Sequence, residues 1–193
     1  MIYNVINKMS LSNTVFYFDG PAGQFTFSTS DSTINYATYS SQMTSGVAMI
    51  QVDIGTSCST IEADCFNQTN VNDKLVTITF LEVEAATPGM TIGARAFQQL
   101  NNATTDISIV FPVRLVSLGD SCFYNSLRLI SISLNNTNIT TIENSCFDTC
   151  ANLASAITIP SSVTTLGFLA FYACSSIPSV TFENGSTLTS IPE

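Results

Sequence analysis

The stretch Ile142-Glu143-Asn144-Ser145-Cys146-Phe147 is one of five similar phrases along the chain. The others are Ile61-Glu62-Ala63-Asp64-Cys65-Phe66, Ile92-Gly93-Ala94-Arg95-Ala96-Phe97, Leu118-Gly119-Asp120-Ser121-Cys122-Phe123 and Leu166-Gly167-Phe168-Leu169-Ala170-Phe171. An aliphatic residue stands five positions before each Phe, and Cys or Ala stands directly before it. Periods of roughly 20–50 residues are typical of solenoids, in which each unit buries its apolar face only against its neighbours. The phrases therefore predict a solenoid over residues 60–193.

A short alternating run follows each phrase. The runs cover residues 76–80, 107–111, 130–134, 157–159 and 179–182. Branched or aromatic residues that alternate with Ser and Thr predict half-buried strands. The residues expected to point inward are Ile78, Phe80, Ile109, Phe111, Ile132, Leu134, Ile157, Ile159, Val180 and Phe182. Each coil is thus expected to hold one strand, a turn, a second short extended segment and about two helical turns around its Phe.

The repeat as a whole resembles a known family. The pattern Ile-x-x-Ile-Gly-x-x-Ala-Phe-x-x-Cys-x-x-Leu, followed by x-Ile-x-Ile-Pro, resembles the BspA-type leucine-rich repeat. Residues 139–160 and 163–182 carry it most fully, whereas residues 67–74 and 98–106 are longer inserts. The resemblance implies an α/β leucine-rich-repeat solenoid, with a parallel sheet and short helices, in residues 47–193. It also implies a surface protein that adheres, binds partners or builds outer layers, with no catalytic residues.

The first 46 residues follow a different pattern. Two aromatic alternating runs, residues 14–19 and 24–28, flank Gly20-Pro21-Ala22-Gly23. Gly and Pro between two such runs predict a β-hairpin. Residues 48–54 read as a further strand that begins a degenerate coil before the first Phe. Residues 1–46 are accordingly interpreted either as a β-rich cap or as a module that pairs with another subunit.

Composition narrows the classes of partner. The chain has a net charge of −9, and only 10% of its 193 residues are charged. A negative surface disfavours nucleic acid and anionic membranes. No apolar run approaches the roughly 18–20 residues of a membrane span, so membrane insertion is not expected. Met1-Ile2-Tyr3-Asn4 does not begin a recognisable signal peptide. An extracellular, cell-surface or virion location is nevertheless the expectation that the resemblance supports.

The six cysteines fall mostly on repeat positions. Cys65, Cys122 and Cys146 alternate with Ala at one position, and Cys150 and Cys174 share another. A site that accepts Cys or Ala is small and apolar, which favours buried thiols. Disulfides between stacked coils remain an alternative. Cys58 lies outside both positions and is expected to be the most reactive thiol.

The sequence offers no candidate residues for catalysis or for cofactor binding. The chain has no His, so the common Ser–His and Cys–His nucleophile pairs cannot form. No C-x-x-C pair or phosphate-binding loop is present in the sequence. Glu62 and Glu143 share a repeat position with glycines and are interpreted as turn residues. No enzyme activity, cofactor or metal is predicted.

Two surface features are candidates for function. The first is a stripe of small hydroxyl residues on the outward side of the sheet: Thr77, Thr79, Ser108, Ser131, Ser133, Thr158, Ser179 and Thr181. The second is a set of N-x-S/T sequons that would accept N-linked glycans in a secreted protein: Asn67, Asn102, Asn135, Asn138 and Asn184.

The expected function is structural or adhesive, with head-to-tail self-association into oligomers or filaments through residues 1–46 and about 163–193. The alternative is a soluble module that binds a protein or glycan on the Ser/Thr face. Ice binding by a regular hydroxyl array is a third hypothesis. An ordinary solvated sheet would show the same stripe of hydroxyls.

Overall fold

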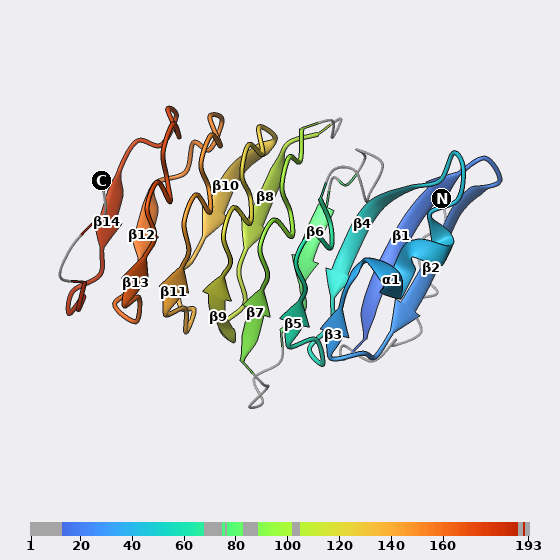
Figure 1. The fold of residues 1–193 in the computed structure, drawn as a ribbon, viewed down its shortest axis with the longest axis horizontal. Coiled ribbons are helices and arrows are strands. Elements are labelled where there is room, and N and C mark those ends of the chain that lie inside the picture. The colour runs from blue at the N-terminus through green and yellow to red at the C-terminus, as the bar shows by residue number, and fades with distance from the viewer. Residues whose placement is uncertain are drawn as a thin grey trace.

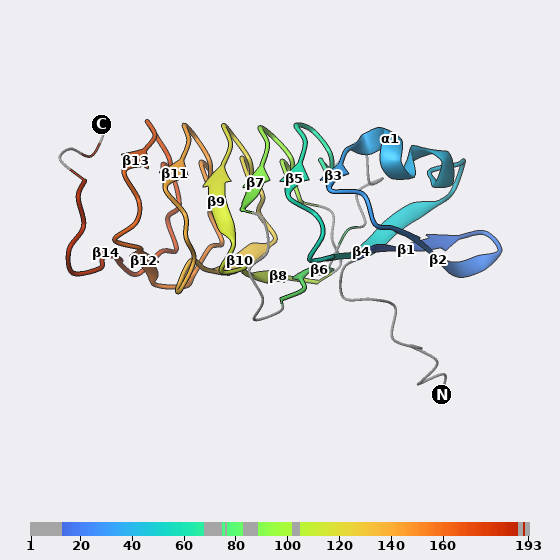
Figure 2. The same ribbon diagram turned by 90° about the horizontal axis from the view of Figure 1, so that it is seen from below.

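The computed structural model describes residues 13–67, 75, 77–82, 89–101, 105–188 and 191. These residues form a solenoid whose coils follow one another from the N-terminal to the C-terminal end (Figure 1). The strands lie in two rows, which Figure 2 shows edge-on. The predicted leucine-rich-repeat solenoid with an N-terminal β-rich region is thus confirmed.

The first row contains the N-terminal hairpin and one strand from each coil. Its strands are β2 (Gly23–Thr29), β1 (Thr14–Gly20), β4 (Ala48–Ile54), β6 (Thr77–Phe80), β8 (Ile107–Val110), β10 (Leu129–Ser133), β12 (Ile157–Ile159) and β14 (Val180–Phe182). The hairpin predicted around residues 20–23 is confirmed, because β1 and β2 pair antiparallel. Strand β4 pairs antiparallel with β1 and parallel with β6, and its Val52 faces Ile78. It is the strand of the degenerate first coil that the sequence predicted.

The second row is a parallel sheet of six short strands. They are β3 (Thr33–Ile34), β5 (Thr60–Ile61), β7 (Met90–Ile92), β9 (Leu115–Leu118), β11 (Thr141–Ile142) and β13 (Thr165–Leu166). The aliphatic residue five positions before each Phe pairs with its equivalent in the next coil, as Ile142 does with Leu118 and Leu166. Since β3 pairs with β5, the first 46 residues supply strands to both rows. The proposed boundary between residues 46 and 47 stays a prediction.

The recurring Phe residues form a continuous stack of rings. The ring centroids of Phe66, Phe97, Phe123, Phe147 and Phe171 are 5.1, 5.3, 5.3 and 5.2 Å apart in that order, with nearly parallel planes. These distances lie within the usual range for aromatic pairs, whose ring contacts stabilise a fold in addition to the burial of their surface. The first four rings are fully buried. The Phe ladder is therefore the spine of the core, as the sequence predicted.

The ladder begins one coil earlier than the sequence analysis found. Tyr39 stacks on Phe66 at 5.5 Å, and its hydroxyl donates a hydrogen bond to the Cys65 carbonyl. Tyr39 closes the helix α1 (Tyr36–Tyr39), which Asn35 caps and the 3₁₀ helix η1 (Ser40–Gln42) follows. Phe16, on β1, packs against both Tyr39 and Phe66, with ring centroids 5.2 and 6.2 Å away. Ile34 stands five positions before Tyr39, so the same spacing was the signal for this ring.

The short helix expected around each Phe is wrong. Within the described residues the five Phe segments are turns, in which the residues two before and two after the Phe have positive φ. These residues are Asp64, Arg95, Gln99, Ser121, Asn125, Ser145, Thr149, Leu169 and Ala173. A left-handed residue interrupts the i to i−4 hydrogen bonds of an α-helix. The amides bond to the next coil instead: Phe97 donates to the Cys122 carbonyl at 2.9 Å.

Eight of the ten residues predicted to point inward from the strands are buried, and two are partly exposed. Ile78, Phe80, Ile109, Phe111, Ile132, Leu134, Ile157 and Ile159 are buried. Val180 is 41% exposed and Phe182 is 37% exposed. Both belong to β14, which pairs with β12 on one side and with no described strand on the other. Their exposure follows from the position of their coil at the end of the described stack, because the alternation itself is the same as in the other coils.

Close packing between coils explains the recurrent glycine one position after the aliphatic residue. A Cβ atom on Gly119 would lie 2.7 Å from the backbone of the preceding coil, and one on Gly167 would lie 2.3 Å from it. Real Cβ atoms do not approach a backbone this closely. Glu143 lies between these two coils, so the crowding depends on each local contact.

Candidate binding surfaces

The predicted hydroxyl stripe lies on one face of the first row. Thr77 and Thr79 on β6, Ser108 on β8, and Thr181 on β14 are exposed, while Ser131, Ser133 and Thr158 are half-buried. Ser179 is exposed directly before β14. The parallel register places Ser108 beside Ser131 and Thr158 beside Thr181, whose hydroxyl oxygens are 3.4 Å apart. Their function as a binding face stays a prediction.

One residue interrupts this row of hydroxyls. Val110 occupies an outward position of β8 beside Ser133 and is 73% exposed. A large apolar side chain in the middle of the stripe breaks the regular array on which the ice-binding hypothesis rests. A mixed face of hydroxyl and apolar groups resembles a contact surface for a protein or glycan more closely.

The N-terminal part of the same face carries polar side chains that the sequence analysis did not identify. The Tyr17 hydroxyl donates a hydrogen bond to Asp53 Oδ2 at 3.0 Å, and Gln51 Nε2 donates to Asp53 Oδ1 at 2.9 Å. Burial, followed by the hydrogen bond and the charge of Asp53, raises the pKa of Tyr17 to about 12. Asp53 pairs with Thr79 in the parallel ladder. Asp53 and Thr79 are 26 residues apart, about one repeat, and this spacing was the sequence signal that Asp53 lies on the same face.

The predicted glycan acceptors lie in turns at the edges of the coils. Asn135, Asn138 and Asn184 are exposed, and Asn67 is half-buried, whereas Asn102 lies outside the described residues. Thr137, the hydroxyl residue of the Asn135 sequon, is buried and donates to the Leu134 carbonyl at 2.7 Å. Use of these sites stays a prediction.

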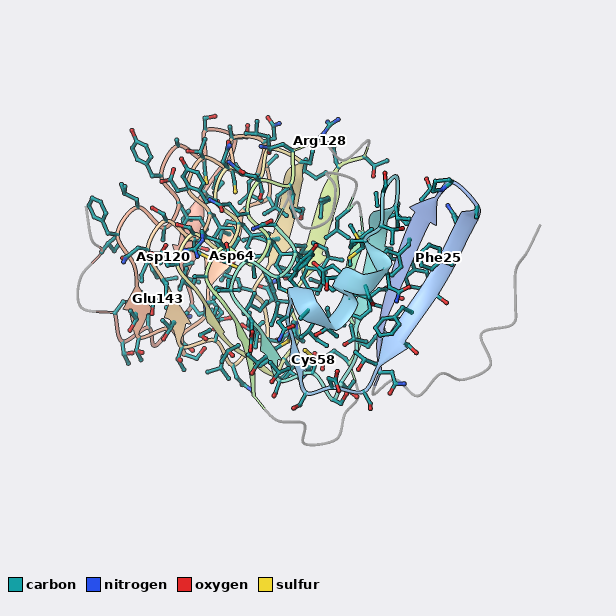
Figure 3. All side chains as sticks on the ribbon, turned by 45° about the vertical axis from the view of Figure 1, so that its right-hand side comes forward. Phe25, Cys58, Asp64, Asp120, Arg128 and Glu143 are labelled. Carbon is teal, nitrogen blue, oxygen red and sulfur yellow. The ribbon has the colours of Figure 1, made fainter. Side chains whose placement is uncertain are left out.

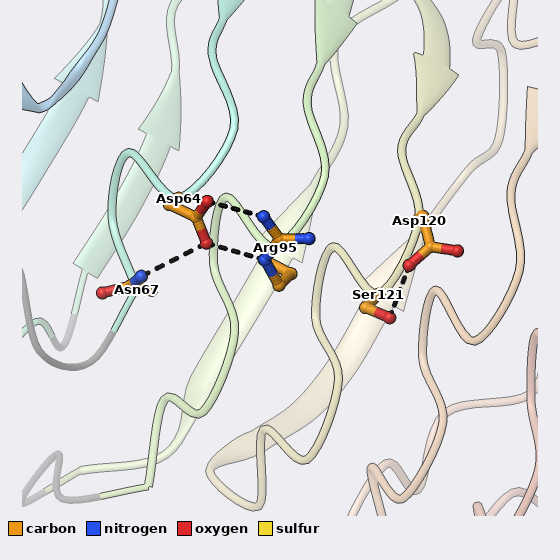
Figure 4. Close-up of polar contacts among 5 residues, drawn as sticks. All are labelled: Asp64, Asn67, Arg95, Asp120 and Ser121. Carbon is orange, nitrogen blue, oxygen red and sulfur yellow. Dashed lines mark hydrogen bonds and ion pairs between the residues drawn. The ribbon is translucent and has the colours of Figure 1, made fainter.

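Charged side chains meet on the ridge formed by the Phe turns. Arg95 Nε and Nη2 donate to the two carboxylate oxygens of Asp64 at 2.8 and 2.7 Å, and Asn67 donates to the same carboxylate (Figure 4). The Arg95 hydrogen bond lowers the pKa of Asp64 and raises the pKa of the guanidinium. Both side chains are more than two fifths exposed, so this pair contributes little to stability. The two residues occupy the same repeat position in successive coils.

The thiols are free and mostly buried. Cys58, Cys65, Cys122, Cys146 and Cys150 are buried, whereas Cys174 is half-buried. Desolvation raises the pKa of Cys58 and of Cys174 to about 11, and it raises the pKa of Cys146 well above the usual value. The full burial of Cys58, beside the half-buried Cys174, contradicts the expectation that Cys58 is the most reactive thiol. Cys58 lies under the side chain of Arg114, which donates hydrogen bonds to the Cys58 and Gly55 carbonyls.

Hydrogen bonding explains why one repeat position prefers Cys or Ser. The Cys150 thiol donates to the Phe123 carbonyl at 3.1 Å, and the Cys174 thiol donates to the Phe147 carbonyl at 2.9 Å. The Ser126 hydroxyl makes the same bond to the Phe97 carbonyl at 3.0 Å. A small side chain with a donor fits this site, so these cysteines need no redox role.

Each end of the solenoid has a surface hollow. The hollow at the C-terminal end has a volume of about 390 Å³, and Leu166, Phe171, Val180, Phe182 and Ile191 are among its lining residues. The hollow at the N-terminal end, about 340 Å³, lies between the hairpin turn and η1. Phe25 lines it and lies on the outer hairpin strand (Figure 3). The hollows differ in chemistry, because the C-terminal one is mainly apolar and the N-terminal one contains several hydroxyl and amide groups.

The described part of the chain contains neither a candidate metal site nor a membrane-spanning helix. No group of three or more His, Cys, Asp or Glu residues there is arranged to hold a metal ion. The described helices are too short to cross a membrane.

Comparison with known proteins identifies the family of this solenoid. The model of the BspA-type leucine-rich repeat region matches residues 77–193 with six copies, and the chain belongs to this family. The crystal structure of the pneumococcal vaccine antigen PcpA is similar, with a TM-score of 0.56 and 25% sequence identity. The similarity covers 70% of this chain but 31% of PcpA. No curated protein matches the chain.

Proposed function

We propose that this chain is a non-catalytic structural or adhesive repeat protein that works outside the cell, or on the surface of a cell or virion, and associates head to tail with further copies. One observation carries this proposal. The last described coil presents an apolar hollow bordered by the unpaired edge of β14, where equivalent residues of earlier coils are buried. Exposed apolar patches and unpaired strand edges are typical contact sites.

The comparisons support the protein-binding part of the proposal. BspA-type repeats define the class of solenoid, and solenoids bind partners on extended surfaces. The similar crystal structure is that of a vaccine antigen, which favours a location that antibodies reach. The absence of His from the chain supports a non-catalytic role.

Sedimentation velocity over a range of concentrations tests the self-association. The expected result is a weight-average sedimentation coefficient that rises with concentration, with linear particles in electron micrographs. A single species of monomer mass at high concentration would contradict the proposal. Point variants are better tools here than a deletion of residues 1–46, because that deletion removes both Phe16 and Tyr39, whose rings pack against Phe66.

A second function, binding of a protein or glycan on the sheet face, has its own supporting observation. The Tyr17–Asp53–Gln51 group and the exposed Val110 lie on the face that carries the hydroxyl stripe. A glycan array and affinity capture would test it with wild type and with Thr79→Lys and Thr181→Lys. Thr164→Lys, at an exposed position away from this face, is the matched control. Binding that the first two substitutions remove and the third leaves unchanged would support this function.

A further inference from the structure

We propose that the head-to-tail contact is a strand addition, in which β14 of one copy pairs in parallel with β2 of the next copy. This inference rests on the self-association proposed above and specifies its partner, orientation and register. The partner is a second copy of this chain, and the contact continues the first row of strands from one molecule into the next.

The two strands are the outer members of the same row. Strand β2 pairs only with β1, and β14 pairs only with β12, among the described strands. Figure 1 shows β2 and β14 at opposite ends of the molecule. A translation along the solenoid axis therefore brings the β14 edge of one copy to the β2 edge of another. Such a contact is heterologous, and repetition of it produces an open filament.

The strand directions agree with this translation. Strand β2 is antiparallel to β1, and β1 is antiparallel to β4, so β2 runs parallel to β4. Strand β4 is parallel to β6, and β12 is parallel to β14. Because every coil repeats the same path (Figure 1), β2 has the direction that a strand after β14 would have. The hairpin thus gives the N-terminal end a strand that can continue the parallel sheet.

The inner sides of the two edges carry similar side chains. Phe25, on β2, is 37% exposed and stacks on the buried Phe18 at 5.1 Å, so it lies on the core side of the sheet. Val180 and Phe182 occupy the core side of β14, beside the buried Ile157 and Ile159. Pairing of the two edges would remove these partly exposed apolar groups from water, which favours association.

The surfaces around the two end hollows differ in charge from the chain as a whole. The chain has a net charge of −9, which repels copies of itself over most of the surface. None of the residues that line either end hollow is charged. The linings of the two hollows therefore add no like charges to the contact.

The alternation of the strands selects a register. Val180 beside Phe25 and Phe182 beside Phe27 keep the apolar side chains on the core side. Thr181 then lies beside Thr26 on the outer face, next to Thr158, whose hydroxyl is already 3.4 Å from that of Thr181. Neighbouring positions in a sheet have Cα separations within the range that a disulfide can bridge.

Cross-linking between two single-cysteine additions tests this register. Thr181→Cys protein mixed with Thr26→Cys protein should give a disulfide-linked dimer under mild oxidation. Thr181→Cys mixed with Val110→Cys, at an exposed outward position of the same row of strands, is the control and should give only the background that Cys174 produces in wild type. Equal cross-linking in both mixtures, or none in the first, would overturn the strand addition.

Charged substitutions at each end test the orientation. Val180→Asp and Phe25→Asp should each abolish the concentration-dependent sedimentation of wild type, whereas Val110→Asp should not change it. An equimolar mixture of the two end variants should form a dimer and nothing longer, because one intact tail meets one intact head. The melting temperature of each variant, measured at a concentration where wild type is monomeric, shows whether the fold is kept.

The outcomes separate this inference from the proposed function. If both end variants associate as wild type does, self-association stands and the strand addition is wrong. If Val180→Asp prevents association and Phe25→Asp does not, the contact joins two C-terminal ends, and the head-to-tail orientation is wrong. If wild type is monomeric at every concentration, the proposed self-association and the strand addition both fail.

Discussion

The two ends of this solenoid expose the same kind of core to different extents. At the N-terminal end, Phe16 packs on Tyr39, and both rings are buried. At the C-terminal end, Phe171 stacks on Phe147 on one side, while Val180 and Phe182 are more than a third exposed. One repeat sequence therefore builds either buried core or partly exposed apolar surface, depending on whether a described neighbour lies beside it.

Alanine substitutions in the Phe ladder should have the largest effects and should differ between the interior and the end. Phe147 has a ring on each side, so Phe147→Ala should lower the free energy of unfolding by about 3–5 kcal/mol. Phe171→Ala should cost less, about 1–2 kcal/mol, because part of this side chain is already in water. Urea denaturation at a monomeric concentration measures both. Equal losses would show that the C-terminal end is as well packed as the interior.

Substitution of two crowded glycines by Ala should destabilise an interior coil more than a coil near the C-terminal end. Gly119→Ala would place a Cβ 2.7 Å from the backbone of the preceding coil, and further coils follow on its other side. The expected cost is about 1–3 kcal/mol, because the stack cannot yield. Gly167→Ala meets an even closer contact, yet we expect a smaller loss because the last coil can move outward. Glu143→Ala, at the same repeat position, serves as the control. A larger loss of unfolding free energy for Gly167→Ala than for Gly119→Ala would contradict the expectation that the last coil can move outward.

The thiols should report the difference between the ends through their reactivity. Cys174 is half-buried near the C-terminal end, whereas Cys58 is buried near the N-terminal end. A native-state thiol reagent at pH 8 should modify Cys174 first and leave Cys58 unmodified, as mass spectrometry of peptides would show. Modification of Cys58 before Cys174 would contradict the described packing.

The same thiols predict a loss of stability at alkaline pH. Burial raises the pKa of Cys58 and Cys174 to about 11, above the value of about 8.5 for an unfolded thiol. The folded chain therefore holds these protons more firmly, which stabilises it below about pH 8.5 and is lost as the pH rises toward 11. Denaturation midpoints should fall over this interval. Cys58→Ala should make the fall shallower, and a midpoint that stays constant would contradict the assigned burial.

The smallest effect should come from the exposed ion pair on the ridge. A double-mutant cycle with Asp64→Ala and Arg95→Ala should give a coupling energy below about 1 kcal/mol that decreases with added salt. A larger coupling would mean that charge, as well as apolar packing, holds the coils together.

The solenoid could be predicted from the sequence because the Phe-containing phrase recurs at similar intervals along the chain. Phe147 and its equivalents recur with the same neighbours, and each repetition supports the others. The turns around them were harder to predict, because Ser145 and Thr149 have positive φ without being glycine. That conformation is selected by hydrogen bonds to the next coil, such as the one from the Phe147 amide to the Ala170 carbonyl at 2.8 Å. Local propensity contains no information about such bonds.

The candidate surfaces were predicted only in part, for a similar reason. Alternation placed Thr158 and Thr181 on the outward face correctly. The Tyr17–Asp53 hydrogen bond joins residues on two different strands, so it requires the register of β1 on β4, which residue spacing alone does not provide. The exposure of Val180 likewise depends on which strand lies beside β14.

Hydrogen exchange of the monomeric chain, resolved by residue, shows whether bonds between neighbouring coils protect the Phe ladder and where that protection stops. The amides of Phe97, Phe123 and Phe147 each donate to the next coil, and they should exchange only on global unfolding. The Phe171 amide, which has no such partner among the described residues, should exchange orders of magnitude faster. Equally slow exchange at Phe171 in the monomer would contradict the missing hydrogen bond at the last described coil, and fast exchange at Phe123 would contradict the hydrogen-bonded ladder itself.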